Sequence, residues 1–321
     1  MRGECVLYNR DLPHRQVTAW LSAALIPTVI QLTSGASWLS VLIACIVSLL
    51  CIWIRWAFGA EPTGKMATIL QWAFLTVVLG MSCKASAQSW PGGSAAAVGI
   101  ILLLLALWSV SKGISASASV GCVLFWFVLI LYMIILGAGV KDVQIEWLKP
   151  TKSEVDPFAS VLLLTPAAGA IQLSKKETPE HRLLLIGVFC TIAAAVTSGV
   201  LSAQVAERKD YAFYEMTRSL NLLGQARRFE AVLSAAMTAG WFSLLSFYLA
   251  MCAKLAEKLR PGSGKVGSVA ASLIAAVFVL FNLHIPELIL LVLGAVFWVL
   301  LPLLTQGLVI IKKSQKNKNN A

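Results

Sequence analysis

Two apolar segments, each interrupted by proline, are the parts of this sequence whose backbone could bind a small molecule. The first covers residues 17–33 and contains Pro27, and the second covers residues 158–173 and contains Pro166. Proline removes a backbone donor and clashes with the carbonyl four residues earlier, so we expect each helix to kink or open there. Inside a bilayer, such a break survives only where it faces protein, water or a ligand. The matched pair therefore predicts a binding site near the membrane midplane.

Unwound backbone at these two breaks would present bare amides and carbonyls. Half-helix dipoles would direct positive ends at an anion such as a carboxylate. The small residues after Pro166 would let a ligand approach the backbone closely. The alternative is that each proline only bends a packed helix, because proline and glycine are common in membrane spans. The candidate ligand-binding residues are Ile26, Pro27, Thr28, Thr165, Pro166, Ala167, Ala168 and Gly169.

The composition identifies the environment in which these segments must fold. Of the 321 residues, 58% are hydrophobic and 13% are charged, against about 25% charged in an ordinary soluble domain. This excludes a soluble globule and indicates an integral membrane protein. The net charge of +11 comes from lysines and arginines in short loops between apolar runs, where they set membrane orientation. We therefore expect contact with membrane lipid and no nucleic-acid partner.

Ten apolar runs are candidates for membrane-spanning helices, since a helix needs about 20 residues to cross. We predict an all-α, single transmembrane domain over residues 1–321, with halves 17–139 and 158–311 joined by a charged linker, 140–157. Five helices in each half would give the second half inverted topology, with broken helices at positions one and six. The runs are 17–33, 38–57, 67–86, 95–111, 118–139, 158–173, 183–204, 229–253, 267–282 and 286–311.

The charges between these runs predict the orientation. Ten spans place both termini on one side, and 17 of the 26 lysines and arginines then fall on that side, leaving 9 on the other. Because positive residues accumulate on the cytoplasmic side, we expect both termini to be cytoplasmic.

The long outer segment at 205–228 has apolar residues at roughly helical spacing among charged ones. This pattern predicts an amphipathic helix across the outer face of the protein. The simpler interpretation is a solvated interfacial helix. The sharper one is a cap that moves when a ligand closes the site, with Tyr214 and Arg218 as its gating residues.

Chemistry beyond binding finds little support in the sequence. There is no nucleophile elbow, no paired carboxylate at depth and no HExxH, so we expect no enzyme activity. The seven cysteines contain no CxxC pair, and we expect neither a metal site nor a cofactor. Ionisable residues are nearly absent from the apolar runs, which weakens the hypothesis of an active pump.

Two stretches resemble a known family. The sequence LPHRQ at residues 12–16 resembles the short entry segment of the spore-germination permeases, the B subunits of endospore germinant receptors. The sequence FYEMTR at 213–218, followed by RFEA at 228–231 and then Trp241, is similar to the outer helix and eighth span of that family.

The resemblance implies membership of the amino acid–polyamine–organocation superfamily and its LeuT-like 5+5 inverted-repeat fold. It further implies a spore inner-membrane protein that senses a small germinant, often an amino acid, beside an A subunit and a lipoprotein C subunit. Two alternatives remain open: an active amino-acid transporter of the same superfamily, and a membrane scaffold that no longer binds a ligand.

Overall fold

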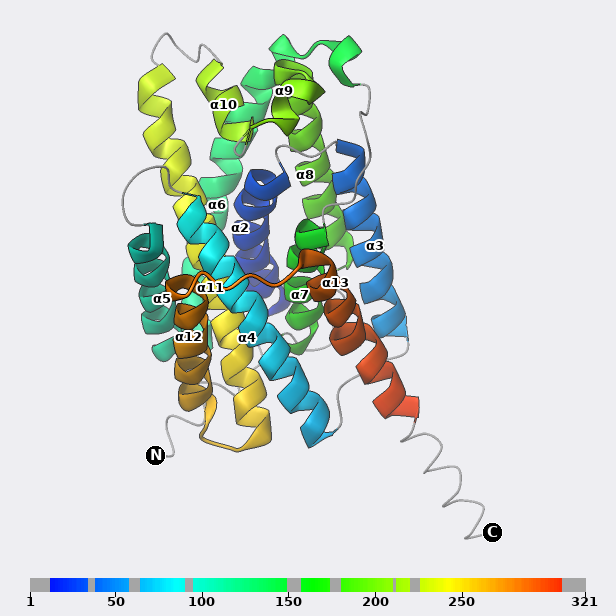
Figure 1. The fold of residues 1–321 in the computed structure, drawn as a ribbon, viewed down its shortest axis with the longest axis vertical. Coiled ribbons are helices and arrows are strands. Elements are labelled where there is room, and N and C mark those ends of the chain that lie inside the picture. The colour runs from blue at the N-terminus through cyan, green and yellow to red at the C-terminus, as the bar shows by residue number, and fades with distance from the viewer. Residues whose placement is uncertain are drawn as a thin grey trace.

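The chain folds as a bundle of α-helices in the computed structural model (Figure 1). The structure describes residues 12–33, 38–57, 64–89, 95–148, 157–173, 180–209, 212–219 and 226–307. Within these ranges no extended strand occurs, which confirms the prediction of an all-α fold. The lysine-rich tail at 312–318 lies outside the described residues.

Ten main helices follow one another along the chain, with shorter elements between them. The first five are α2 (His14–Thr33), α3 (Trp38–Ala57), α4 (Lys65–Gln88), α5 (Ala95–Ser111) and α6 (Ile114–Gly139). The other five are α7 (Pro157–Leu173), α8 (Glu180–Leu201), α11 (Ala226–Leu259), α12 (Gly264–Leu280) and α13 (Glu287–Ala295), which continues through a π-helical turn. The shorter elements are η1 (Val140–Asp142), η2 (Ile145–Leu148), α9 (Ala203–Glu207) and α10 (Ala212–Ser219).

Six helices in the described part of the chain are long and apolar enough to cross a membrane. They are His14–Thr33, Lys65–Gln88, Ile114–Asp142, Leu184–Leu201, Ala231–Leu259 and Glu287–Gly307. Four further apolar helices are shorter, namely Trp38–Ile54, Ala96–Ser111, Ser160–Ala170 and Gly264–Leu280. An all-α membrane protein is thus confirmed, while crossing by all ten helices stays a prediction.

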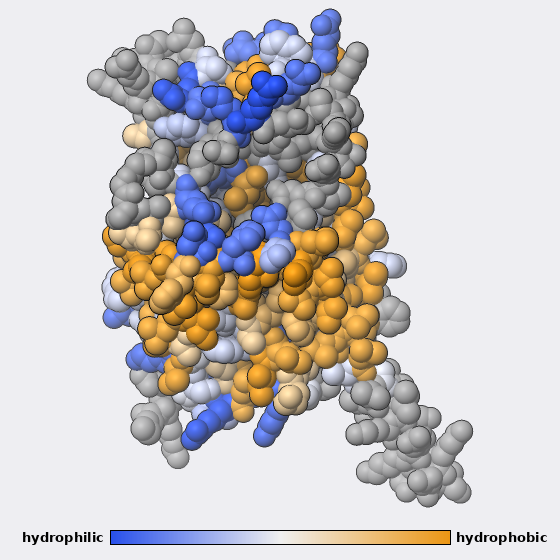
Figure 2. All heavy atoms as spheres, in the orientation of Figure 1, coloured by the Kyte–Doolittle hydropathy of each residue, from blue (hydrophilic) through white to orange (hydrophobic). Residues whose placement is uncertain are grey.

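The outer surface agrees with a membrane environment. Apolar residues form a broad band across the lower half of the face shown in Figure 2, with hydrophilic residues above it, up to the upper end, and at its lower edge. Large apolar side chains on α6, α8 and α12 point away from the protein, including Val123 at 72% exposed and Leu185 at 66%. In water this would be a severe cost, but in lipid the same surface is solvated.

Successive main helices run in alternating directions (Figure 1). Consequently α2 begins at the lower end of the molecule in this view, and α13 runs toward that same end. The backbone amide of Leu12, just before α2, donates to the carbonyl of Leu173 at the end of α7, with an N···O distance of 3.0 Å. The start of α2 and the end of α7 therefore lie side by side, and the two proline-containing helices are antiparallel.

Helix α11 is the centre of the bundle and packs on α2, α4, α5, α6 and α12. Three of its aromatic residues, Trp241, Phe247 and Tyr248, are fully buried, and Phe247 meets the Trp20 ring of α2 edge-on, with ring centroids 5.1 Å apart. The indole of Trp241 donates to Gln31 Oε1 over 2.8 Å. Trp20 and Trp241 are therefore core residues that hold α2 against α11, and they do not lie at the membrane–water interface.

The described part of the predicted linker packs on the bundle. The Gln144 amide donates to the Gly199 carbonyl of α8 at 2.9 Å, and the Trp38 indole of α3 donates to the Leu148 carbonyl at 2.9 Å. Residues 149–156 of the linker lie outside the described residues. The first part of the connection between the halves, residues 140–148, is therefore hydrogen-bonded to α3 and α8.

Candidate functional site

The predicted break in α2 is absent: the helix is continuous through Pro27 from His14 to Thr33. The Thr28 hydroxyl donates to the Ala24 carbonyl over 2.6 Å, and the segment is almost completely buried. The prediction that the backbone opens here is therefore wrong. A proline inside an otherwise regular helix costs one backbone hydrogen bond, whereas unwinding a turn in apolar surroundings would leave several groups unsatisfied.

The space beside Pro27 is filled by helix α11. A Cβ added to Gly240 would lie 2.6 Å from Cβ and 2.7 Å from Cγ of the Pro27 ring. The absence of a side chain at Gly240 therefore lets α2 and α11 approach closely at this level. Pro27 has a packing role that sequence reasoning did not anticipate, because its partner is more than two hundred residues away.

Helix α7 is likewise continuous through Pro166, from Pro157 to Leu173, so the second predicted break is also wrong. A Cβ at Gly169 would fall on the thioether of Met251, which occupies the space beside the glycine. Ala167 borders a void of only about 10 Å³ between α3, α7 and α8, at the lower limit for one water molecule. In this conformation, the backbone near Pro166 faces protein.

The structure nevertheless brings the two candidate segments into one region. Helices α2 and α7 contact each other, and both pack on α11. The residues from Thr165 to Gly169 are all buried, as are Ile26, Pro27 and Thr28. Whether these residues bind a ligand stays a prediction.

One candidate residue has an unusual hydrogen-bonding state. The Thr165 side chain is completely buried and its hydroxyl has no hydrogen-bond partner. Other buried threonines of the membrane helices donate to the carbonyl four residues earlier; these are Thr28, Thr33, Thr76 and Thr197. A buried hydroxyl without a partner costs about 1–3 kcal/mol, so its retention requires an explanation.

Further buried hydroxyls of α4 and α11 share this state. Ser243 and Tyr248 of α11 and Ser82 of α4 are fully buried, and none makes a hydrogen bond of good geometry. The Tyr248 and Ser82 hydroxyls are neighbours. On α11, Tyr248 precedes Met251 by about one helical turn. On the parallel helix α7, Thr165 precedes Gly169 by one turn, and Met251 fills the space beside Gly169. These polar groups were missed from sequence because serines and tyrosines in apolar helices have no distinctive spacing.

The predicted outer helix is present in part, as α10. Its apolar side is buried, with Phe213 stacked on Tyr132 of α6 at a centroid distance of 5.3 Å and Met216 fully enclosed. Helix α10 packs on α2, α6, α8 and α11. Of the proposed gating residues, Tyr214 is half-buried, while Arg218 is exposed and pairs with Glu215 at 3.7 Å. Residues 220–225, including Gly224, lie outside the described residues.

Comparison with known proteins found no relative from which a family or function could be taken. No protein-family model matches the chain, and no curated protein is similar to it.

Proposed function

We propose that the ten main helices form a 5+5 inverted repeat of the LeuT-like type and that all ten cross the membrane. The proposal pairs each helix with the one five positions later: α2 with α7, α3 with α8, α4 with α11, α5 with α12 and α6 with α13. Because successive helices alternate in direction, the members of each pair run oppositely, as an inverted repeat requires.

The pattern of helix contacts supports this pairing. The contact of α2 with α6 is matched by that of α7 with α13, and the contact of α4 with α5 by that of α11 with α12. Crossed contacts are matched too: α2 with α8 by α3 with α7, and α4 with α12 by α5 with α11. The most extensive contact, that of α2 with α11, has no counterpart of similar extent, since α13 lies between α7 and α4, with Gly294 between Phe74 and Leu164. The weaker contacts of α5 with α6 and of α7 with α11 are also unmatched.

Within this architecture, we propose that the chain is a membrane-embedded subunit that senses a small zwitterion, in the manner of a spore germinant receptor. The unpartnered Thr165 hydroxyl carries the proposal, together with the resemblance of residues 12–16 and 213–218 to the permease-like B subunits. A ligand that displaced Met251 from Gly169 would reach Thr165, and its ammonium or carboxylate group would satisfy the buried hydroxyl. The conformation in which Met251 fills the space beside Gly169 is then the ligand-free one.

The proposal extends to location and partners on the same grounds. The protein would lie in the spore inner membrane beside an A subunit and a lipoprotein C subunit, with both termini on the core side. The buried carboxylate of Glu257 accepts backbone N–H groups of the turn after α11, which gives it a structural role, and ionisable residues are nearly absent from the apolar runs. This favours a sensor over an active transporter of the same superfamily.

The variant Thr165→Val tests the site. Valine has nearly the same shape and removes the unpartnered hydroxyl, so the folded protein is expected to gain about 1 kcal/mol of stability. The same change is expected to abolish stabilisation by an amino-acid ligand. The measurement is thermal unfolding of the purified protein in nanodiscs against a panel of proteinogenic amino acids, since a ligand that binds only the folded state raises Tm.

The matched control is Thr197→Val, because Thr197 is equally buried but its hydroxyl donates to the Ala193 carbonyl at 2.8 Å. It is expected to keep the ligand response. If no amino acid stabilises the wild type, the scaffold alternative is favoured. Concentrative uptake of a labelled amino acid into proteoliposomes would instead identify a transporter.

A second expectation concerns the outer cap. Phe213→Ala removes the ring stacked on Tyr132 and should loosen α10, shifting the dose–response curve or permitting a response without ligand. Arg218→Ala is expected to have a smaller effect, because its ion pair with Glu215 is exposed and worth less than about 1 kcal/mol. Germination assays of spores carrying each variant measure both. Identical curves for wild type and Phe213→Ala would make α10 a static cover.

A further inference from the structure

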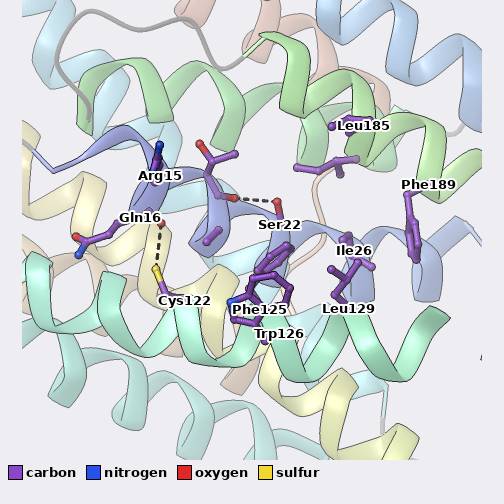
Figure 3. Close-up of a pocket in the computed structure, with 13 residues that line it drawn as sticks. Arg15, Gln16, Ser22, Ile26, Cys122, Phe125, Trp126, Leu129, Leu185 and Phe189 are labelled. Carbon is purple, nitrogen blue, oxygen red and sulfur yellow. Dashed lines mark hydrogen bonds between the residues drawn. The ribbon is translucent and has the colours of Figure 1, made fainter. Parts of the chain in front are cut away.

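A lateral groove with a volume of about 620 Å³ runs between α2, α6 and α8 (Figure 3). It lies apart from the Thr165 region, although Ile26 of the predicted site forms part of its wall. Figure 3 shows Arg15 and Gln16 at one end and Ile26, Leu129 and Phe189 at the other. The volume falls within the usual range of small-molecule sites in proteins.

The two ends of the groove differ in chemistry. Arg15 is exposed at the first turn of α2, where the helix dipole adds partial positive charge. Beside it, the buried Gln16 Oε1 atom has no hydrogen-bond partner. Further in, Thr18 and Ser22 donate to carbonyls of their own helix at 2.7 and 2.8 Å, so their hydroxyl protons are not available to a ligand. The groove is therefore apolar along its length and cationic at its mouth.

The length and the side openings of the groove match one membrane leaflet. From Arg15 to Ile26 the helix rises about 16 Å at 1.5 Å per residue, close to half of the roughly 30 Å hydrocarbon core. Along this length the groove is bordered by side chains that face outward, with Trp126 at 62% and Leu185 at 66% exposed. An occupant can thus enter sideways from the leaflet on the side where α2 begins.

We propose that this groove is a binding site for an anionic phospholipid. One acyl chain lies between α2, α6 and α8, with its terminal methyl toward Ile26 and Phe189, and the phosphate sits against the Arg15 guanidinium. The apolar wall selects an acyl chain, and the cationic mouth selects an anionic headgroup over a zwitterionic one. Because Ile26 also belongs to the α2 segment near Pro27, an occupied groove holds that segment of α2 against α6.

Photo-crosslinking in nanodiscs tests the proposal. The probes are phosphatidylglycerol and phosphatidylcholine, each with a diazirine on one acyl chain, and cross-linked peptides are identified by mass spectrometry. Phosphatidylglycerol is expected to label α2, α6 and α8 peptides more than phosphatidylcholine does. Arg15→Gln should reduce phosphatidylglycerol binding about fivefold, as expected for one arginine near an anionic headgroup. Ala19→Phe should block both probes by filling the groove.

Lys112→Gln is the matched control, because Lys112 lies at the same end of the bundle, over the Trp108 ring and outside the groove. It should leave labelling of the groove unchanged. Equal labelling by the two probes, or unchanged labelling in Arg15→Gln, would overturn the headgroup assignment. Absence of labelling of the α2, α6 and α8 peptides by both probes would overturn the proposal as a whole. Arg15 is exposed, so its variant is expected to fold normally, and Tm of each variant is measured first.

Discussion

Gly240→Ala is expected to destabilise the protein by about 2 kcal/mol and to lower its Tm by roughly 4 °C. The added methyl group would fall 2.6 Å from Cβ of Pro27, on a ring that cannot rotate away because the pyrrolidine is fixed to the backbone of α2. Helices α2 and α11 must separate to accept it. The resulting loss of packing outweighs the roughly 1 kcal/mol by which alanine is the better helix former.

Differential scanning fluorimetry of the purified protein in one detergent measures this effect. Gly137→Ala is the matched control, since Gly137 also lies inside a helix but has no atom within 4 Å of an added Cβ. That variant should be neutral or slightly stabilised. Gly169→Ala should be intermediate, because the atoms in its way belong to the flexible end of Met251. A Gly240→Ala protein as stable as Gly137→Ala would show that Pro27 does not hold α2 on α11.

The main helices could be predicted from the sequence because the bilayer leaves so few alternatives. A long apolar run in a bilayer must form its backbone hydrogen bonds within the segment, which requires a helix. The predicted runs at 38–57 and 95–111 accordingly have the same bounds as α3 and α5. The errors occur where polar residues extend a helix beyond its apolar run. Helix α6 begins at Ile114, four residues before the predicted run at 118–139, and therefore also includes Ser115 and Ser117.

The candidate site was less accessible to sequence reasoning, because it depends on contacts between distant helices. Pro27 predicts a break from local sequence alone. In the structure, the Thr28 hydroxyl bonds to the Ala24 carbonyl and Gly240 leaves room for the Pro27 ring, and both contacts stabilise a continuous helix over an unwound one. Thr165 was selected only for its position next to Pro166. Its unpartnered hydroxyl, and its place one turn from the contact between Gly169 and Met251, are tertiary facts that no local pattern encodes.

Glu257→Ala should cause a still larger loss, about 3 kcal/mol, or roughly 6 °C in Tm. The Glu257 carboxylate is 7% exposed and accepts the backbone N–H groups of Gly262 at 2.8 Å and Gly264 at 3.0 Å. Gly262 has a φ of +86°, a conformation that the glycine adopts without strain, and Gly264 begins α12. The carboxylate thus closes the turn between α11 and α12 and places negative charge at the N-terminus of α12.

The alanine variant leaves both backbone donors without their acceptor and removes the charge, so the turn should open before the rest of the protein unfolds. Hydrogen exchange of residues 260–266 should therefore accelerate together with the fall in Tm. Glu257→Gln keeps one side-chain oxygen as an acceptor and should lose about half as much. Glu146→Ala, at an exposed carboxylate in η2, is the control and should change stability by less than about 0.5 kcal/mol. Equal Tm values for the Glu257→Ala and Glu146→Ala proteins would mean that other contacts between α11 and α12 hold the turn. A selective loss would show that the membrane protein depends on this buried carboxylate for its stability.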